Sequence, residues 1–530
     1  MKYLYLFSLA FPVVMFLAGG AAGQEIEQAT PEPVVSETQG ETPAESSSEE
    51  PFFGEEESAE TEEQEGEEEK IFQINGYIQN QTGIFFSTEK DKFDADELPT
   101  DHGDKFGKLS MFRNTLFIEA DWKPFPEVSI HGIFRGVRSL KLDADKDAQV
   151  PEPGYKKDAD KRIDWVYDNF YNETDLRELY VDIEASKYLS FRVGKQQVTW
   201  GDTGQYRLLD VINPIDSTWH FSALESFEDQ RIPLWIFKAL LDIPFLDGNL
   251  EFVWVPMLDD PKDLVTIPLT LPGAWGLPLV PLQEDPNVKQ SSINQKIFMY
   301  PDNDIENSRL GARWKGVVGN LTYTFAYFYT HVISPPIPYF MIQRYGAGDE
   351  GYDVYLNFPR QHVAGLSLDY TLGYPFATIL RFEAAYEPDR TYPVWSKRNA
   401  LTNPNPEILP NKDAKFYFYK EEKQVLSYAV SLMRPTFIRF LNPEQSIMVV
   451  LQFMHSWILD FDPEEHILEI PGYDSTESTE HSFRLIGSVF TNYFHGLLTP
   501  RLVGIWIPDG GGAIFSGALG LTLGNHWRIN

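Results

Sequence analysis

The sequence predicts an all-β fold: a transmembrane antiparallel β-barrel of about 16 strands, preceded by a disordered acidic tail. Segments of about ten residues alternate apolar and polar side chains along most of the 530 residues. The connections between them are alternately short and long, as in outer-membrane barrels. Hydrophobic content of 42% with a mean hydropathy of −0.31 excludes a helical membrane protein but fits a barrel, whose lipid-facing and interior residues roughly cancel.

The first segment is an export signal. Lys2 precedes an apolar run from Tyr3 to Leu17, and Ala21-Ala22-Gly23 then supplies the small residues of a cleavage site. Residues 1–23 are therefore expected to be a signal peptide, because the apolar run is too short to span a membrane comfortably.

Residues 24–70 differ sharply in composition from the rest. They contain 18 Glu and one Lys, so this segment carries −17 of the formal net charge of −35. Blocks of like charge repel and cannot bury a core, which predicts a disordered acidic tail. A solvated spacer is favoured over an interaction role, and the barrel is assigned to residues 71–530.

Sixteen strands are expected in the barrel. Their approximate ranges are 71–87, 108–123, 127–140, 176–185, 187–200, 230–243, 248–257, 307–318, 319–333, 360–373, 376–387, 424–434, 445–457, 481–493, 500–507 and 513–523. Short turns belong on the periplasmic side and long loops outside. This rule predicts a protein of the bacterial outer membrane with its N-terminal tail in the periplasm. A soluble all-β array is the alternative, but it would not require alternating loop lengths.

The two faces of the strands can be assigned by parity. Leu116, Ile118, Ala120 and Trp122 are predicted to face lipid, while Arg113 shares the opposite parity. The same reasoning turns inward a further set of charged residues: His131, Arg135, Arg309, Arg313, Arg381 and Glu383. Each of these is more readily a solvated wall residue than a selectivity element. Trp122, Tyr386, Trp457 and Trp506 lie near segment ends, where an aromatic girdle would place them.

One stretch organises the rest of the chain. The second half of a hairpin over residues 176–200 contains most of the run Arg192-Val193-Gly194-Lys195-Gln196-Gln197-Val198-Thr199-Trp200-Gly201. The run Ile212-Asn213-Pro214-Ile215-Asp216 follows it. The loop after the hairpin is either folded into the lumen or a rigid extracellular turn. This run resembles a large Gram-negative outer-membrane β-barrel family of uncharacterised function, with the patterns R-x-G-x-Q-x-x-x-W-G and I-N-P-x-D.

The resemblance extends over residues 71–523 and carries further implications. Genes of that family are often found beside a periplasmic LolB-like protein and an RND-type exporter, which implies transport of hydrophobic molecules and these two possible partners. Barrels of this kind usually close with a terminal aromatic residue, whereas this sequence ends Gly524-Asn525-His526-Trp527-Arg528-Ile529-Asn530. An atypical closing strand and a truncated chain are the two alternatives.

The motif suggests a constriction. Unbroken alternation would aim Lys195 at lipid, at a cost of about 2 to 4 kcal/mol near the midplane. A bulge at Gly194 is therefore expected to turn Lys195, Gln197 and Thr199 inward. The predicted constriction comprises Arg192, Lys195, Gln197, Asp202, Asn213 and Asp216. The alternative is that the strand has already left the membrane at Lys195.

The longest connection contains an uncharged apolar stretch from Leu264 to Leu282. Its four prolines prevent a continuous helix, and exposing it to water would be costly. It is expected either to pack against other loops or to line a path for a hydrophobic ligand. The residues expected to form that lining are Leu264, Leu271, Trp275 and Leu277.

No enzymatic motif stands out, so no catalytic residue, metal or cofactor is predicted. There is no Cys, and the Asp143–Asp147 run lacks the Gly and Glu of a calcium loop. No basic stripe suggests nucleic acid. The sequence therefore favours an outer-membrane channel or transporter for hydrophobic or amphipathic molecules. A general water-filled porin is the alternative, and an outer-membrane hydrolase a distant third.

Overall fold

The computed structural model describes residues 71–84, 109–141, 167, 172–201, 207–216, 227–256, 293–299, 304–331, 337–344, 351–373, 375–395, 418–465, 467, 478–509, 512–523 and 527–529. The predicted signal peptide and acidic tail lie outside these residues. No helix in the described part of the chain is long and apolar enough to cross a membrane.

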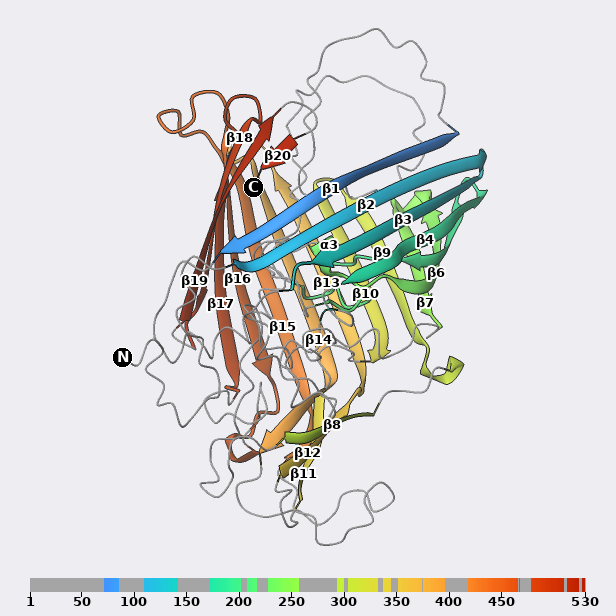
Figure 1. Cartoon of the computed structure of the whole chain (residues 1–530), viewed down its shortest axis with the longest axis vertical. Coiled ribbons are helices and arrows are strands. Elements are labelled where there is room, and N and C mark those ends of the chain that lie inside the picture. Colours follow the sequence, from blue (N-terminus) through green and yellow to red (C-terminus); the bar gives the residue numbers. More distant parts are fainter. Residues whose placement is uncertain are drawn as a thin grey trace.

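Seventeen strands form one antiparallel sheet (Figure 1). They are β1 (Phe72–Ile84), β2 (Leu109–Phe125), β3 (Val128–Ser139), β4 (Glu173–Ser186), β5 (Leu189–Gln196), β6 (Leu234–Ile243), β7 (Gly248–Val255), β9 (Arg309–Val318), β10 (Leu321–His331), β13 (Arg360–Leu372), β14 (Thr378–Trp395), β15 (Phe418–Thr436), β16 (Ile447–Ile458), β17 (His481–Phe490), β18 (Leu498–Ile507), β19 (Gly512–Leu523) and β20 (Trp527–Ile529). Each pairs with the next in this order, which is a simple meander.

Sixteen of these strands correspond to the sixteen predicted ones, and the all-β barrel-type fold is confirmed. The additional strand is β20, a three-residue strand that pairs with the end of β19. A separate sheet of β8 (Ile293–Met299), β11 (Ile337–Arg344) and β12 (Gly351–Asn357) lies in the long connections and was not predicted. Its β12–β8 pair is parallel, so it is not part of the meander.

The connections alternate in length as expected. Two residues join β9 to β10, and a 3-10 turn at Pro244–Leu246 joins β6 to β7. By contrast, 33 residues separate β3 from β4, and 53 residues separate β7 from β9. The short α3 (Phe227–Gln230) lies within one of the long connections.

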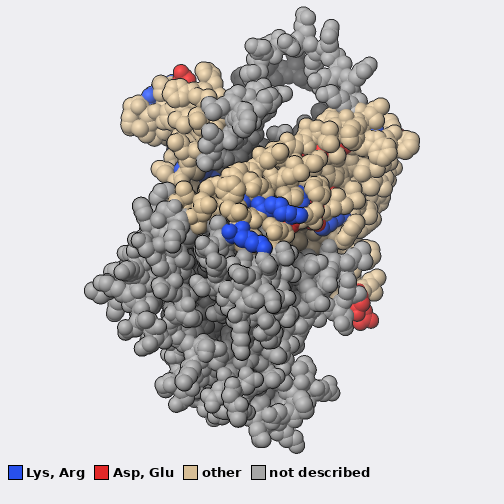
Figure 2. All heavy atoms as spheres, viewed as in Figure 1, with Lys and Arg blue, Asp and Glu red and all other residues tan. Residues whose placement is uncertain are grey.

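The wall has an exposed apolar outer face and a buried polar inner face. Leu451 and Phe453 on β16 are 50% and 37% exposed, whereas Gln452 between them is 1% exposed. The same contrast occurs on β17, where Leu485 and Val489 are exposed on the outer face and Ser488 is buried on the inner face. A soluble sheet would bury its apolar face, so this arrangement suits a wall surrounded by lipid. Figure 2 shows few charged side chains on the visible outer face over β1–β4.

The parity assignments agree with the structure. On β2, Leu116 and Trp122 are exposed while Arg113 is 3% exposed, and on β14 Tyr386 is exposed while Glu383 is fully buried. Trp506 is 52% exposed on the outer face of β18. At these positions the outer face carries apolar and aromatic residues, and the inner face carries the charged ones.

The predicted bulge at Gly194 is wrong. The pairing of β5 with β4 and with β6 continues through Gly194 without a register shift, and Lys195 pairs with Leu179 and Trp235, which are exposed. The irregularity lies instead in β4, whose pairing with β3 skips Arg177. The Lys195 ammonium lies 3.0 Å from Asp175, beside this bulge, and also donates to the Leu176 carbonyl oxygen. Its charge is therefore compensated without a register shift at Gly194.

Gly194 is nevertheless essential to the local geometry. Its φ is +144°, and a Cβ at this position would lie 2.2 Å from the Leu179 carbonyl oxygen. We expect Gly194→Ala to lower the free energy of unfolding by roughly 2 kcal/mol or more, from backbone strain and the clash together. Urea titration in detergent micelles, followed by tryptophan fluorescence, measures this effect. Gly373→Ala is the control, because a Cβ there meets nothing within 4 Å; equal effects of the two changes would contradict the assignment.

Candidate functional site: a segment folded into the interior

The described parts of the connection between β5 and β6 lie across the interior of the sheet. We call residues 197–231 the infolded segment; its described parts are 197–201, 207–216 and 227–231. It contacts strands on both sides of the curved wall, and α3 lies between the front strands β3–β4 and the strands behind them in Figure 1. The sequence left open whether this loop is internal or an extracellular turn, and the structure shows its described parts to be internal.

Two apolar side chains fix the segment into gaps left by wall glycines. Trp200 is 1% exposed and packs edge-on against Phe328, with ring centroids 5.8 Å apart. A Cβ on Gly311 would lie 2.6 Å from the Trp200 ring, and one on Gly365 would lie 2.3 Å from a methyl carbon of Leu209. Only glycine at these two wall positions lets the segment approach so closely.

A buried carboxylate holds two turns of the segment together. Asp210 Oδ2 accepts hydrogen bonds from Arg207 Nε at 2.7 Å and from Arg231 Nε and Nη2 at 3.0 Å. Burial alone would raise the pKa of Asp210, but the two guanidinium groups outweigh it and hold this pKa below the usual range of a carboxyl group. Both arginines also lie 5.8 Å from the Phe227 ring centroid. The ion cluster therefore joins Arg207 and Asp210 to Arg231, which follows α3 directly and lies 24 and 21 positions further along the chain.

Polar contacts attach the segment to its own strands. Asn213 is 1% exposed; its Oδ1 accepts from the Val198 backbone N–H, and its Nδ2 donates to the carbonyl oxygens of Gln196 and Ile232. The side chain of Asn213 thus ties the end of β5 to the residues just before β6. Such satisfied buried amide bonds are costly to break.

Further contacts attach the segment to the strands behind it. Glu383 on β14 accepts from the Leu209 backbone N–H at 2.8 Å. Trp200 Nε1 donates to Glu251 Oε1 at 2.5 Å, and Arg313 donates to the other oxygen of Glu251 at 3.1 Å. Arg313 also donates to the Thr199 carbonyl oxygen. These bonds connect the segment to β7, β9 and β14.

The front wall is attached through two arginines. Arg135 on β3 donates to the Asp229 carbonyl oxygen at 3.0 Å and to the Glu173 carboxylate. Arg177, the bulged residue of β4, donates to the carbonyl oxygens of Glu228 and, at 2.9 Å, Arg231. The bulge thus turns a cation inward to the C-terminal end of α3, where carbonyl oxygens attract positive charge.

The predicted site residues do not form a single ring. Asn213 lies within the infolded segment. Arg309, Arg313 and Glu383 contact that segment from the wall, Arg309 through the Ile212 carbonyl oxygen. Arg192 pairs with Asp182 and Arg381 with Asp369 along the wall. Gln197 donates to Glu178, and Asp216 lies within the segment, its N–H bonded to the Gln230 carbonyl oxygen. Lys195 belongs to the outer-face register, so the constriction built on its inward turn is wrong.

Two predictions fall on residues that the structure does not describe. Asp202 lies in one such gap, and Leu264, Leu271, Trp275 and Leu277 lie in another. Sequence reasoning missed Asp210, Arg231, Leu209 and Glu251. Only the Arg207–Asp210 spacing gave a local signal, because the other contacts join residues far apart in the chain.

Residues 72–513 match the family described as Protein of unknown function (DUF1302), and the chain belongs to that family. No curated protein matches it.

Among solved structures, the chain is similar to Salmonella typhi OmpF in complex with daunomycin (8% identity, 84% of this chain and 97% of that one, TM-score 0.35). It is also similar to Pseudomonas putida OprB (9% identity, 84% and 91%, TM-score 0.38). A third is the anion-selective porin from Comamonas acidovorans (9% identity, 84% and 94%, TM-score 0.34).

Removing the central carboxylate should loosen the infolded segment. Asp210→Asn leaves Arg207 and Arg231 close together without a compensating charge, which typically costs about 3 to 5 kcal/mol. We expect protection of residues 207–216 from hydrogen exchange to fall by at least about 100-fold. Asp182→Asn is the matched control, because it disrupts an Asp–Arg pair that lies along the wall. If it loosened the segment as much as Asp210→Asn, the Asp210 cluster would not be the specific anchor.

The same anchor predicts a flat response to mild acid. The pKa of the Asp210 carboxyl group is lower in the folded state than in the unfolded state. Its ionised form therefore contributes its full stabilisation above the unfolded-state pKa of about 3.9, and this contribution is lost as the pH falls through the folded-state pKa. Protection of residues 207–216, corrected for intrinsic exchange rates, should therefore stay constant from pH 8 to about pH 4 and decline below it. A decline centred near pH 6 would show that another group controls the segment.

Proposed function

We propose that this protein is an outer-membrane channel or transporter, narrowed by its infolded segment, for hydrophobic or amphipathic molecules. The apolar outer face and the polar inner face support a location within a lipid bilayer. The alternating loop lengths support placing the short connections, and with them the tail of residues 24–70, on the periplasmic side.

The observation that carries the choice of cargo is apolar packing inside the wall. One cluster joins the segment to strands β6, β7 and β10 and comprises Val198, Trp200, Ile212, Leu234, Ile236, Val253, Val255 and Phe328. A second comprises Leu208, Leu209, Val363, Ala385, Ala429 and Met454. The interior of a water-filled barrel is polar. Apolar clusters beside paired arginines and carboxylates suit a molecule with both an apolar body and a polar end.

A general water-filled porin is the second candidate. The inward charges Arg192, Arg313 and Arg381 favour it, since charged walls are expected around water. All three are paired with carboxylates. They are therefore compatible with either candidate and do not decide between them. The LolB-like and RND-type partners implied by the family resemblance would fit the first candidate, because both handle hydrophobic molecules.

Conductance in planar bilayers separates the two candidates. We expect the purified wild-type protein to show little steady conductance, because the infolded segment is anchored on both sides of the interior. A proteoliposome assay with a lipophilic fluorescent probe should instead show protein-dependent transfer. A steady, large open pore without probe transfer would favour the porin and contradict the first proposal.

Loosening the apolar anchors should open the path. We expect the double variant Trp200→Ala, Leu209→Ala to raise the conductance at least several-fold, because both side chains fill gaps at wall glycines. Trp506→Ala is the matched control, since it removes an indole from the outer face, where Trp506 is 52% exposed. Equal conductance in the wild type and the double variant would mean that the segment does not restrict the path.

A further inference from the structure

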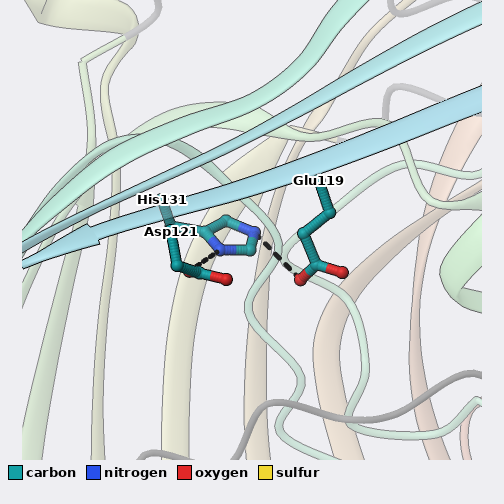
Figure 3. A group of neighbouring side chains, drawn as sticks. All are labelled: Glu119, Asp121 and His131. Atoms are coloured by element: carbon teal, nitrogen blue, oxygen red, sulfur yellow. Dashed lines mark hydrogen bonds and ion pairs between the residues drawn. The ribbon is translucent and has the colours of Figure 1, made fainter. Parts of the chain in front are cut away.

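We propose that Glu119, Asp121 and His131 form a binding site for a divalent transition-metal ion on the inner face of β2 and β3. The three side chains project from one face of the two strands toward one another (Figure 3). Their potential ligand atoms all lie within 4.8 Å of one another. The site is separate from the infolded segment, and its metal chemistry does not depend on the proposed cargo.

The strand register brings the three residues together. Asp121 and His131 are direct cross-strand partners on either side of the short turn between β2 and β3. Glu119 lies two residues before Asp121 and therefore on the same face. On the other side, β1 pairs Gln73 with Asp121 and Asn75 with Glu119, so it contributes uncharged amides at these positions. Two carboxylates and an imidazole thus converge on one face of β2 and β3, beside two amide side chains of β1.

The imidazole is already held in the orientation that a metal ligand requires. His131 Nδ1 lies 2.7 Å from Asp121 Oδ1, and its ring stacks on Tyr180, the residue opposite it on β4, at 4.8 Å between centroids. Arg192 lies 4.1 Å from the Tyr180 ring centroid and is itself paired with Asp182. A histidine that donates one ring N–H to a carboxylate presents its other nitrogen, unprotonated, to a metal.

The remaining nitrogen points to a second ligand across a gap of suitable size. His131 Nε2 and Glu119 Oε1 are 3.9 Å apart, which is too long for a hydrogen bond. A tetrahedral ion with bonds of about 2.0 to 2.2 Å to both atoms would need about 3.4 Å between them. A side-chain adjustment of about half an ångström closes that difference. Imidazole with carboxylate favours Zn²⁺ or a similar ion over Ca²⁺ or Mg²⁺, which prefer oxygen ligands alone.

The side chains are accessible to an ion from the interior. Glu119 and Asp121 side chains are 33% and 51% exposed, while that of His131 is 14% exposed. An ion held by His131 Nε2 and Glu119, with Asp121 orienting the imidazole, would keep further coordination positions for water. The structure therefore supports a reversible site on the wall and not a closed structural one.

Zinc titration of the purified full-length protein tests the proposal. We expect isothermal titration calorimetry with Zn²⁺ to show one saturable site, weakened at least tenfold by His131→Phe and by Glu119→Gln. His131→Phe keeps a ring to stack on Tyr180. Asp121→Asn should weaken binding less than either, because an amide oxygen can still accept from His131 Nδ1. Glu127→Gln, in the turn between the same strands, is the matched control and should bind like the wild type.

Two results would overturn the site. One is the absence of saturable Zn²⁺ binding to the wild type; the other is binding that persists unchanged in both His131→Phe and Glu119→Gln, which would place the ion elsewhere. The shift in gel mobility on heating shows whether each variant is folded. If His131→Phe is misfolded, His131→Gln is used in its place. Zinc binding in a protein that transfers no lipophilic probe would reject the proposed function while leaving the metal site intact.

Discussion

The attachment of the infolded segment to both sides of the wall is the constraint on which the interior depends. Asp210 joins Arg207 to Arg231, and Leu209 and Trp200 occupy gaps that exist only because Gly365 and Gly311 lack side chains. These contacts are buried and include both polar and apolar groups, so together they specify where the described parts of the segment lie. Without them a 37-residue connection between β5 and β6 would have no reason to lie inside the sheet.

The recognisable motif of the chain is explained by the same constraint. Gly194 allows β4 to approach, and Gln196, fully buried, donates to the Ile236 carbonyl oxygen across the β5–β6 ladder. Trp200 and Gly201 lie in the first described part of the infolded segment, and Asn213 ties the middle of the segment back to β5. Gln196, Trp200 and Asn213 therefore each have a structural role in placing the segment. On the two proposals above, cargo and ions would meet the surrounding wall side chains, such as those around His131.

Sequence reasoning recovered the strands because a period of two is a local property, visible in any ten residues. The parity of Leu116 against Arg113, or of Tyr386 against Glu383, needed no knowledge of neighbouring strands. The error at Gly194 arose because the compensation for Lys195 comes from β4: Asp175 and the bulge at Arg177 are invisible within β5. Likewise, the partners of Leu209 and Trp200 are glycines more than 100 residues away, and an isolated Gly in a strand does not reveal what fills the space beside it.

The most direct test of the account is a disulfide between the segment and the wall. The chain has no cysteine, so Leu209→Cys with Gly365→Cys introduces the only pair, at positions where a Gly365 Cβ would lie 3.1 Å from Leu209 Cγ. The account predicts rapid cross-linking under mild oxidation in native membranes, detected as a shift in gel mobility that reductant reverses. Leu209→Cys with Gly487→Cys, on the outer face of β17, should not cross-link. Persistent free thiols in the first pair, under conditions that oxidise a small dithiol, would contradict the infolded position of the segment.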